Sequence, residues 1–102
     1  MNFDIPLIPM ATKILIPTPL RQYTDKLNAL EFKADTVEDL LNGLTQRYPV
    51  LTQHLFSEDG RLRSFVNVYV NDEDIRYLQK MQTKLTEKDI VSIVPSIAGG
   101  LD

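Results

Sequence analysis

The sequence predicts an α+β domain, in which a mixed sheet of about four to five strands carries one main helix on one face. Three observations support this fold class: short β-branched runs near both ends of the chain, one apolar stripe at helical spacing between them, and a composition that is 43% hydrophobic and 25% charged. A length of 102 residues corresponds to one domain. We therefore divide the chain into a flexible N-terminal arm at 1–11, a domain at 12–98 and a tail at 99–102.

Two strands are predicted to form a hairpin at the start of the domain. Residues 12–17 are a short β-rich run that ends in a Pro-containing segment, and residues 27–34 form a second run after a moderately long loop. Period-two alternation places Ile14 and Ile16 on one face and Leu15 on the other.

The main helix is predicted to begin after Thr36, which can cap its N-terminus, and to stop at Pro49. Acidic residues in its first turn suit the positive end of the helix dipole. Its apolar residues recur at intervals of three and four, namely Val37, Leu40, Leu41, Leu44 and Tyr48. Such a stripe is buried against a sheet, so we assign it to the core. Residues 50–56 are expected to add a further helical turn.

Two further strands are predicted after the helix, at residues 65–70 and 90–94. In the first, Val66, Val68 and Val70 share one face by alternation. Residues 71–74 between the strands are acidic but lack the ligand spacing of a calcium loop, so we interpret them as a solvated turn. The order of strand, strand, helix, strand, strand is a β-grasp pattern, in which the first and last strands pair in parallel at the centre.

The composition excludes several classes of function. Since the chain has no cysteine, it can form no disulfide, no thiolate metal site and no cysteine nucleophile. The single histidine, His54, supports neither a metal cluster nor a catalytic triad, and we interpret it as a solvated side chain. A net charge of -3 gives no reason to expect nucleic acid or a membrane surface as partner. No run approaches the roughly 20 apolar residues of a membrane span, and the N-terminus lacks signal-peptide features. We expect a cytoplasmic protein that is not an enzyme and needs no cofactor or metal.

Three segments carry a resemblance to a known family. Residues 85–100 (LTEKDIVSIVPSIAGG) resemble the turn, strand, proline and tail signature of the β-grasp sulfur carriers, relatives of ubiquitin that include MoaD and ThiS. Residues 13–21 (KILIPTPLR) and 63–78 (RSFVNVYVNDEDIRYL) are most similar to the CysO-like carriers of cysteine biosynthesis. The resemblance covers about residues 11–100 and implies a ubiquitin-like β-grasp fold.

The resemblance also implies the chemistry of the tail. In this family the carboxylate of the second glycine, here Gly100, is adenylated by a ubiquitin-activating-like adenylyltransferase and sulfurtransferase and becomes a thiocarboxylate. Gly99 and Gly100 lack a Cβ, which suits them to a narrow channel. In the CysO-like branch the sulfur passes to a pyridoxal-phosphate-dependent cysteine synthase.

The chain departs from the family pattern at its end, where Leu101 and Asp102 follow the glycine pair. A free carboxylate on Asp102 cannot replace that of Gly100. Either a protease removes these two residues or the chain is inactive as a carrier. The resemblance favours the first, with a metallopeptidase of the JAMM type that cuts between Gly100 and Leu101.

The face of the sheet away from the helix is the expected docking surface. Alternation leaves an apolar patch there, next to the exit of the tail, and relatives use this face and the tail together. The residues predicted to contact partners are Leu15, Pro17, Arg21, Tyr69, Val94, Pro95 and Ile97.

Three alternatives stay open at this point. The carrier could serve as the small subunit of molybdopterin synthase, with the large subunit as its partner, or as a thiazole-synthesis carrier. It could also be a ubiquitin-like binding module whose tail does no chemistry.

Overall fold

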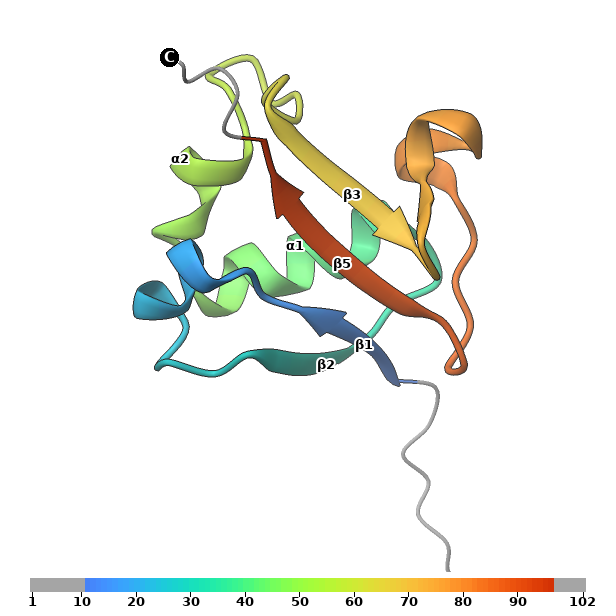
Figure 1. The fold of residues 1–102 in the computed structure, drawn as a ribbon, viewed down its shortest axis with the longest axis horizontal. Coiled ribbons are helices and arrows are strands. Elements are labelled where there is room, and N and C mark those ends of the chain that lie inside the picture. Colours follow the sequence, from blue (N-terminus) through green and yellow to red (C-terminus); the bar gives the residue numbers. More distant parts are fainter. Residues whose placement is uncertain (1–10, 97–102) are drawn as a thin grey trace, which may run out of the picture.

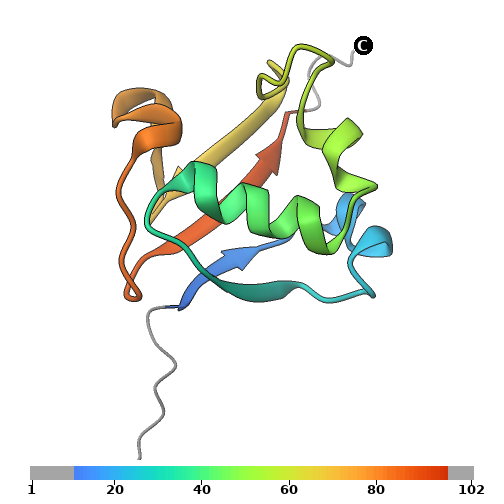
Figure 2. The same ribbon diagram turned by 180° about the vertical axis from the view of Figure 1, so that it is seen from behind.

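The computed structural model describes residues 11–96, which form a sheet of five strands in the order β2-β1-β5-β3-β4, with a helix across one face (Figures 1 and 2). The strands are β1 (Ala11–Leu15), β2 (Ala29–Lys33), β3 (Val66–Val70), β4 (Glu73–Asp74) and β5 (Ile90–Pro95), and the main helix is α1 (Val37–Arg47). The predicted α+β class is confirmed, and so is the single main helix on one face. None of the helices in the described range is long and apolar enough to cross a membrane.

The pairing of the strands places β5 at the centre of the sheet (Figure 1). Strand β1 runs antiparallel to β2 and parallel to β5, and β5 runs antiparallel to β3. The predicted parallel pairing of the first and last strands is therefore confirmed. One row of residues crosses the sheet in register on the helix side, from Leu30 through Ile14 and Val91 to Val70.

Helix α1 follows the predicted pattern. The Thr36 hydroxyl accepts a hydrogen bond from the backbone N–H of Asp39 at 3.2 Å, as expected of an N-cap. Gly43 lies against β2: a Cβ there would come within 3.2 Å of the Phe32 ring, so the glycine allows a close approach of helix and sheet. The apolar stripe is fully buried at Val37, Leu40, Leu41 and Leu44.

The end of the helix differs slightly from the prediction. Tyr48 is half-buried and follows the last helical residue as its C-cap, with its N–H bonded to the carbonyl of Leu44 at 2.9 Å. The second helical turn forms as α2 (Leu51–Leu55), whose Leu51 and Leu55 join the core.

The first hairpin loop contains a 3-10 helix, η1 (Thr18–Tyr23), that the sequence analysis did not anticipate. Strand β1 ends at Leu15, before the two prolines, and β2 begins only at Ala29. Pro17 is extended, with φ of -69°, and Pro19 lies in the first turn of η1, where a missing N–H costs no hydrogen bond. The predicted strands of 12–17 and 27–34 are therefore each shorter than expected.

The interpretation of residues 71–74 as a solvated turn is wrong in part. Asn71 and Asp72 have φ values of +52° and +75°, which is the geometry of a two-residue type I′ hairpin turn. The chain then returns as β4, which places Asp74 opposite Tyr69. Asp74 is only 6% exposed, because the hairpin lays it on the sheet instead of in solvent.

Candidate docking face and root of the tail

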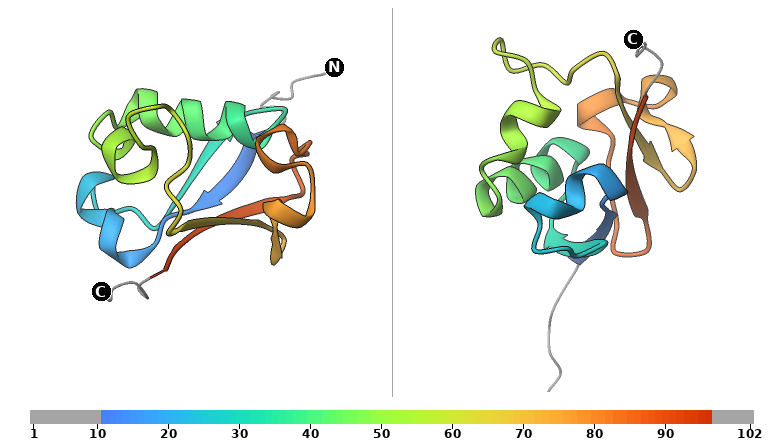
Figure 3. Two further views of the ribbon diagram at one scale, coloured as in Figure 1. Left: turned by 90° about the horizontal axis from the view of Figure 1, so that it is seen from above. Right: turned by 60° about the vertical axis from the view of Figure 1, so that its left-hand side comes forward.

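The described chain ends on the central strand of the sheet, and we call its last residue, Ser96, the root of the tail. Val66 lies opposite Pro95, and the backbone N–H of Ser96 donates to the carbonyl of Phe65 at 2.6 Å, so strand pairing continues to the last described residue. The end of β5 is therefore the last described part of the chain, and it lies between β1 and β3 in the sheet (Figures 1 and 3). The predicted reactive residues Gly99 and Gly100 lie outside the described residues, as do Ile97 and the cleavage position at Leu101.

None of the described helices lies across the face of the sheet that is opposite α1 and α2 (Figure 3). Leu15, Ser92 and Tyr69 are level with one another across β1, β5 and β3, and Val94 is level with Asn67. Leu15 is 38% exposed and Val94 is 43% exposed. The predicted grouping of Leu15, Tyr69 and Val94 on one face is borne out by this register, and we call these three residues the open-face patch.

Pro17 and Arg21 lie at the same end of the sheet as the root of the tail. Since β1 and β5 are parallel and Leu15 is level with Ser92, the residues after β1 lie at the same end of the sheet as the C-terminal end of β5. The Arg21 Nε–H donates to the carbonyl of Ile16 at 2.9 Å, which holds this half-buried side chain beside the end of β1. Pro95 is half-buried and faces the helix side in register with Val66, away from the open-face patch.

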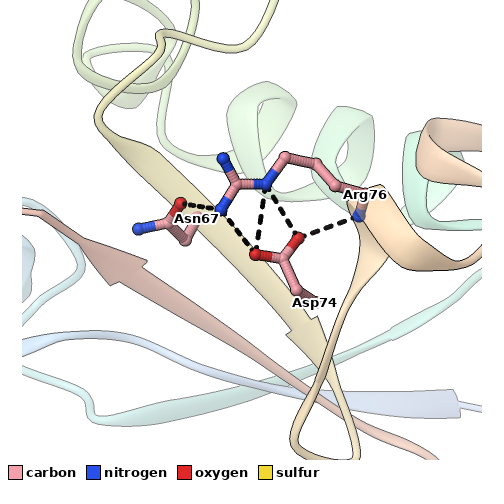
Figure 4. A network of polar contacts seen from close by, with 3 residues as sticks. All are labelled: Asn67, Asp74 and Arg76. Atoms are coloured by element: carbon pink, nitrogen blue, oxygen red, sulfur yellow. Dashed lines mark hydrogen bonds and ion pairs between the residues drawn. The ribbon is translucent and has the colours of Figure 1, made fainter.

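A polar network on the open face was missed by the sequence analysis (Figure 4). The Arg76 guanidinium donates through Nη2 to Asp74 Oδ2 at 2.7 Å and to Asn67 Oδ1 at 3.0 Å, while the Arg76 backbone N–H donates to Asp74 Oδ1 at 2.8 Å. These bonds from Arg76 hold the pKa of the Asp74 carboxyl below its usual range. In turn, the hydrogen bond and charge of Asp74 raise the pKa of Arg76.

The network places a fixed cation beside the apolar patch. Asn67 is level with Val94, so the guanidinium that binds Asn67 lies over β3 at the border of the open-face patch. Its signal in the sequence is the alternation of Asn67, Tyr69 and, across the hairpin, Asp74. That signal becomes readable only when Asn71 and Asp72 are recognised as a type I′ turn.

His54 lies in α2, on the helix side of the sheet and not on the open face. The His54 ring is half-buried and stacks on Tyr23, with the ring centroids 4.6 Å apart, so it is not the solvated side chain that we expected. Between residues 11 and 96, no three His, Cys, Asp or Glu side chains gather into a group able to hold a metal ion.

Comparison with known proteins identifies the relatives of this chain. Residues 14–100 match the model of the ThiS family. The chain is 36% identical over 93 residues to the sulfur carrier protein CysO of Mycobacterium tuberculosis, which covers 89% of this chain and 100% of the relative. It is 30% identical over 91 residues to a putative sulfur carrier protein of Archaeoglobus fulgidus, with the same coverage of 89% and 100%.

Solved structures agree with the sequence relatives. A chain in the crystal structure of the BexX/CysO complex of Amycolatopsis orientalis superposes with a TM-score of 0.79 at 34% identity, covering 88% of this chain and 100% of the other. CysO of Mycobacterium tuberculosis superposes with a TM-score of 0.76 at 32% identity, covering 83% and 98% of the two chains.

Proposed function

The chain belongs to the ThiS family and is a CysO-like sulfur carrier, and from this premise we propose that it carries sulfur as a thiocarboxylate on Gly100. One observation carries the proposal. The central strand β5 remains paired up to Ser96, and the glycine pair follows closely after this residue in the sequence. The match to the family also extends through Gly100 and stops there.

The chemistry requires activation before sulfur transfer. A carboxylate oxygen of Gly100 attacks the α-phosphate of ATP on a ubiquitin-activating-like enzyme, and pyrophosphate leaves. The resulting acyl-adenylate is an electrophile: a sulfur donor at the oxidation level of hydrosulfide forms a C–S bond to the carbonyl carbon while the C–O bond to AMP breaks. No cysteine of the carrier is needed, which agrees with its absence from the sequence.

Removal of Leu101 and Asp102 comes first. In the full-length chain the carbonyl of Gly100 is part of a peptide bond, so it offers no carboxylate for adenylation. A JAMM-type metallopeptidase that cuts after Gly100 would create that carboxylate.

The open-face patch and the root of the tail form the docking site for the activating and receiving enzymes. Leu15 and Val94 offer apolar area, and Tyr69 lies level with Leu15 and Ser92 on the neighbouring strand β3. Pro17 and Arg21 lie at the end of the sheet where β5 ends. A partner that covers this face therefore also lies beside Ser96, from which the chain continues to Gly100 in the sequence.

The destination of the sulfur is proposed to be cysteine biosynthesis, with a pyridoxal-phosphate-dependent cysteine synthase as the receiving enzyme. Support comes from the relatives named CysO, which match this chain over nearly its whole length. Delivery to the large subunit of molybdopterin synthase or to thiazole synthesis is the alternative. Mixing the thiocarboxylate form with each synthase distinguishes these destinations, because only the true acceptor turns it over.

The processing step is tested with two forms of the protein, the full-length chain and a chain that ends at Gly100. Each is incubated with the activating enzyme, ATP and a sulfur source, and its intact mass is measured. We expect the shorter chain alone to gain the mass difference between sulfur and oxygen. Equal modification of both forms would refute the need for processing, and modification of neither would refute the carrier chemistry on Gly100.

A further inference from the structure

Strand β2 forms one edge of the sheet and is paired with another strand on one side. It is the first strand in the order β2-β1-β5-β3-β4, and Figure 1 shows it as the outermost strand beside β1. The strand at the opposite edge, β4, has 2 residues, whereas β2 has 5 residues. An edge strand presents unpaired backbone N–H and C=O groups to which a further strand can be added. Of the two edges of the described sheet, β2 therefore offers more room for such an addition.

The hydrogen bonds between β1 and β2 show which backbone groups of β2 point outward. The backbone N–H of Ile16 donates to the carbonyl of Asn28 at 2.9 Å, and these two residues continue the register of the β1-β2 ladder. Hydrogen-bonded and non-hydrogen-bonded pairs alternate in an antiparallel ladder, so the even-numbered residues of β2 bond to β1. The N–H and C=O groups of Ala29, Glu31 and Lys33 consequently point to the free edge. No residue of the described part of the chain forms a strand partner on that side.

The side chains at this edge carry both signs of charge on one face of the sheet. Phe32 faces the helix side, where its ring lies against Gly43 of α1. By alternation Glu31 and Lys33 face the opposite, open side, and both are exposed. Edge strands are commonly protected from self-association by charged residues such as lysine. Here the glutamate and the lysine lie two residues apart, so the edge can attract a second copy of itself.

We propose that β2 is a self-recognition edge, at which two copies of this chain pair antiparallel about a two-fold axis through Phe32. In this register Glu31 of each copy lies directly opposite Lys33 of the other. Both residues have outward backbone groups, so each such pair exchanges both N–H···O bonds. The five-stranded sheet of one copy then continues into the sheet of the other.

The charges select this register among the antiparallel alternatives. A two-fold axis through Glu31 would place the Glu31 carboxylates of the two copies opposite each other, and an axis through Lys33 would oppose the two ammonium groups. Like charges directly opposite one another destabilise a strand pair, whereas opposite charges stabilise it. With the axis through Phe32, the two phenylalanines form a non-hydrogen-bonded pair on the helix side, with Cα atoms about 4.5 Å apart. Aromatic side chains in such pairs contribute further to the pairing.

This pairing leaves the open-face patch uncovered. A two-fold axis between antiparallel edge strands is perpendicular to the sheet, so the open faces of both copies lie on the same side. Leu15, Tyr69 and Val94 belong to β1, β3 and β5 and not to the edge strand. Self-association is therefore compatible with docking of an enzyme, and the inference is independent of the proposed function.

The first test is the mass of the full-length protein in sedimentation equilibrium, from about 10 μM to about 1 mM. About 0.1 M salt screens charges that are more than about 10 Å apart, which limits the repulsion from the net charge of -3 on each copy. We expect a dimer with a Kd within this range. A monomer at every concentration would overturn the proposal.

Charge reversal tests the register. Glu31→Lys places two lysines opposite each other at both charged pairs, and Lys33→Glu places two glutamates there, so each variant alone should raise Kd at least about tenfold. An equal mixture of the two variants should dimerise again, because the introduced lysine faces the introduced glutamate. The matched control Glu58→Lys has the same change in net charge at another exposed position and should leave Kd unchanged.

The mixture also distinguishes lost pairing from lost folding, since two variants that restore each other must both be folded. An unchanged Kd in both single variants would overturn the proposal. So would a mixture that stays monomeric.

Hydrogen exchange locates the contact. The outward amides of Glu31 and Lys33 should be protected at about 1 mM protein and exchange rapidly at about 10 μM, whereas the Phe32 amide should be protected at both concentrations because it bonds to β1. A dimer in which the protection of the Glu31 and Lys33 amides does not depend on concentration would use another surface, and that result would overturn the proposal.

Discussion

Truncation of Val94 to Ala should weaken binding to the activating enzyme without affecting the fold. Val94 is 43% exposed on the central strand, close to Ser96, the last described residue of the chain. A partner that covers the open-face patch buries this remaining area. The change removes two methyl groups from the proposed interface and leaves the backbone pairing of β5 intact.

The magnitude follows from the exposed fraction of Val94. Complete burial of a valine side chain is worth about 1.5–3 kcal/mol, so the 43% that is still exposed corresponds to about 0.6–1.3 kcal/mol. Alanine keeps the Cβ, which reduces the expected loss to about 0.4–1 kcal/mol, or about two- to fivefold in Kd.

The assay is isothermal titration of each variant with the activating enzyme. Val50→Ala is a matched control, because Val50 is 49% exposed and lies at the start of α2, on the helix side of the sheet. Ile90→Ala is a second control on the same strand and face, at the end of β5 far from the tail. We expect the order of effect Val94, then Ile90, then Val50, with Val50 unchanged. An equal effect of Val94→Ala and Val50→Ala would refute the open-face patch as the docking surface.

Three further predictions concern stability. Leu44→Ala removes a fully buried side chain of α1 and should lower the free energy of unfolding in urea by about 2–5 kcal/mol. As a control, Gln46→Ala at an exposed position should change it by less than about 0.5 kcal/mol. Similar values for the two variants would contradict the assignment of the core. Asp72→Gly should stabilise the protein by about 0.5–1 kcal/mol, because φ is +75° there, and a loss of stability would argue against the type I′ turn. Arg76 lowers the pKa of Asp74 in the folded protein. The pair therefore stabilises the fold at pH values above the pKa of an unfolded aspartate, about 3.9, and this stabilisation is lost as the pH falls through the pKa of the folded state. The urea midpoint should therefore fall less steeply between about pH 5 and pH 2 in Asp74→Asn than in the unaltered protein, and parallel curves would contradict the role of the pair.

Much of the fold could be predicted because it is encoded in local periodicity. The spacing of Val37, Leu40, Leu41 and Leu44 defines a helix with one buried face, and the alternation of β3 separates Val66, Val68 and Val70 from their neighbours. The handedness of crossovers then leaves few arrangements for a hairpin, a helix and two strands, so the parallel pairing of β1 with β5 could be predicted from the order of the elements.

The features that were missed depend on turns and on contacts between distant segments. The 3-10 helix η1 has no apolar period, so residues 18–23 resembled a simple loop. Asp74 was expected in solvent because acidic runs are usually solvated. Its burial instead requires the tight turn at Asn71 and Asp72 and the guanidinium of Arg76, which lies two residues further along the chain.

In the candidate site, too, the features that follow from strand alternation could be predicted, and those that depend on contacts between distant segments could not. Alternation correctly grouped Leu15, Tyr69 and Val94 on one face, since their register follows from the strands alone. The stacking of His54 on Tyr23 could not be foreseen, because it joins α2 to η1, which the sequence does not bring together in any local pattern.

Whether Gly100 carries the sulfur can be read from the intact mass of the protein purified from the cells that make it. We expect a chain that ends at Gly100, with a fraction heavier by the difference between one sulfur and one oxygen atom. Fragmentation should place that difference on the C-terminal glycine. A population that ends entirely at Asp102, or a trimmed chain in cells with active sulfur metabolism that never carries sulfur at Gly100, would contradict it.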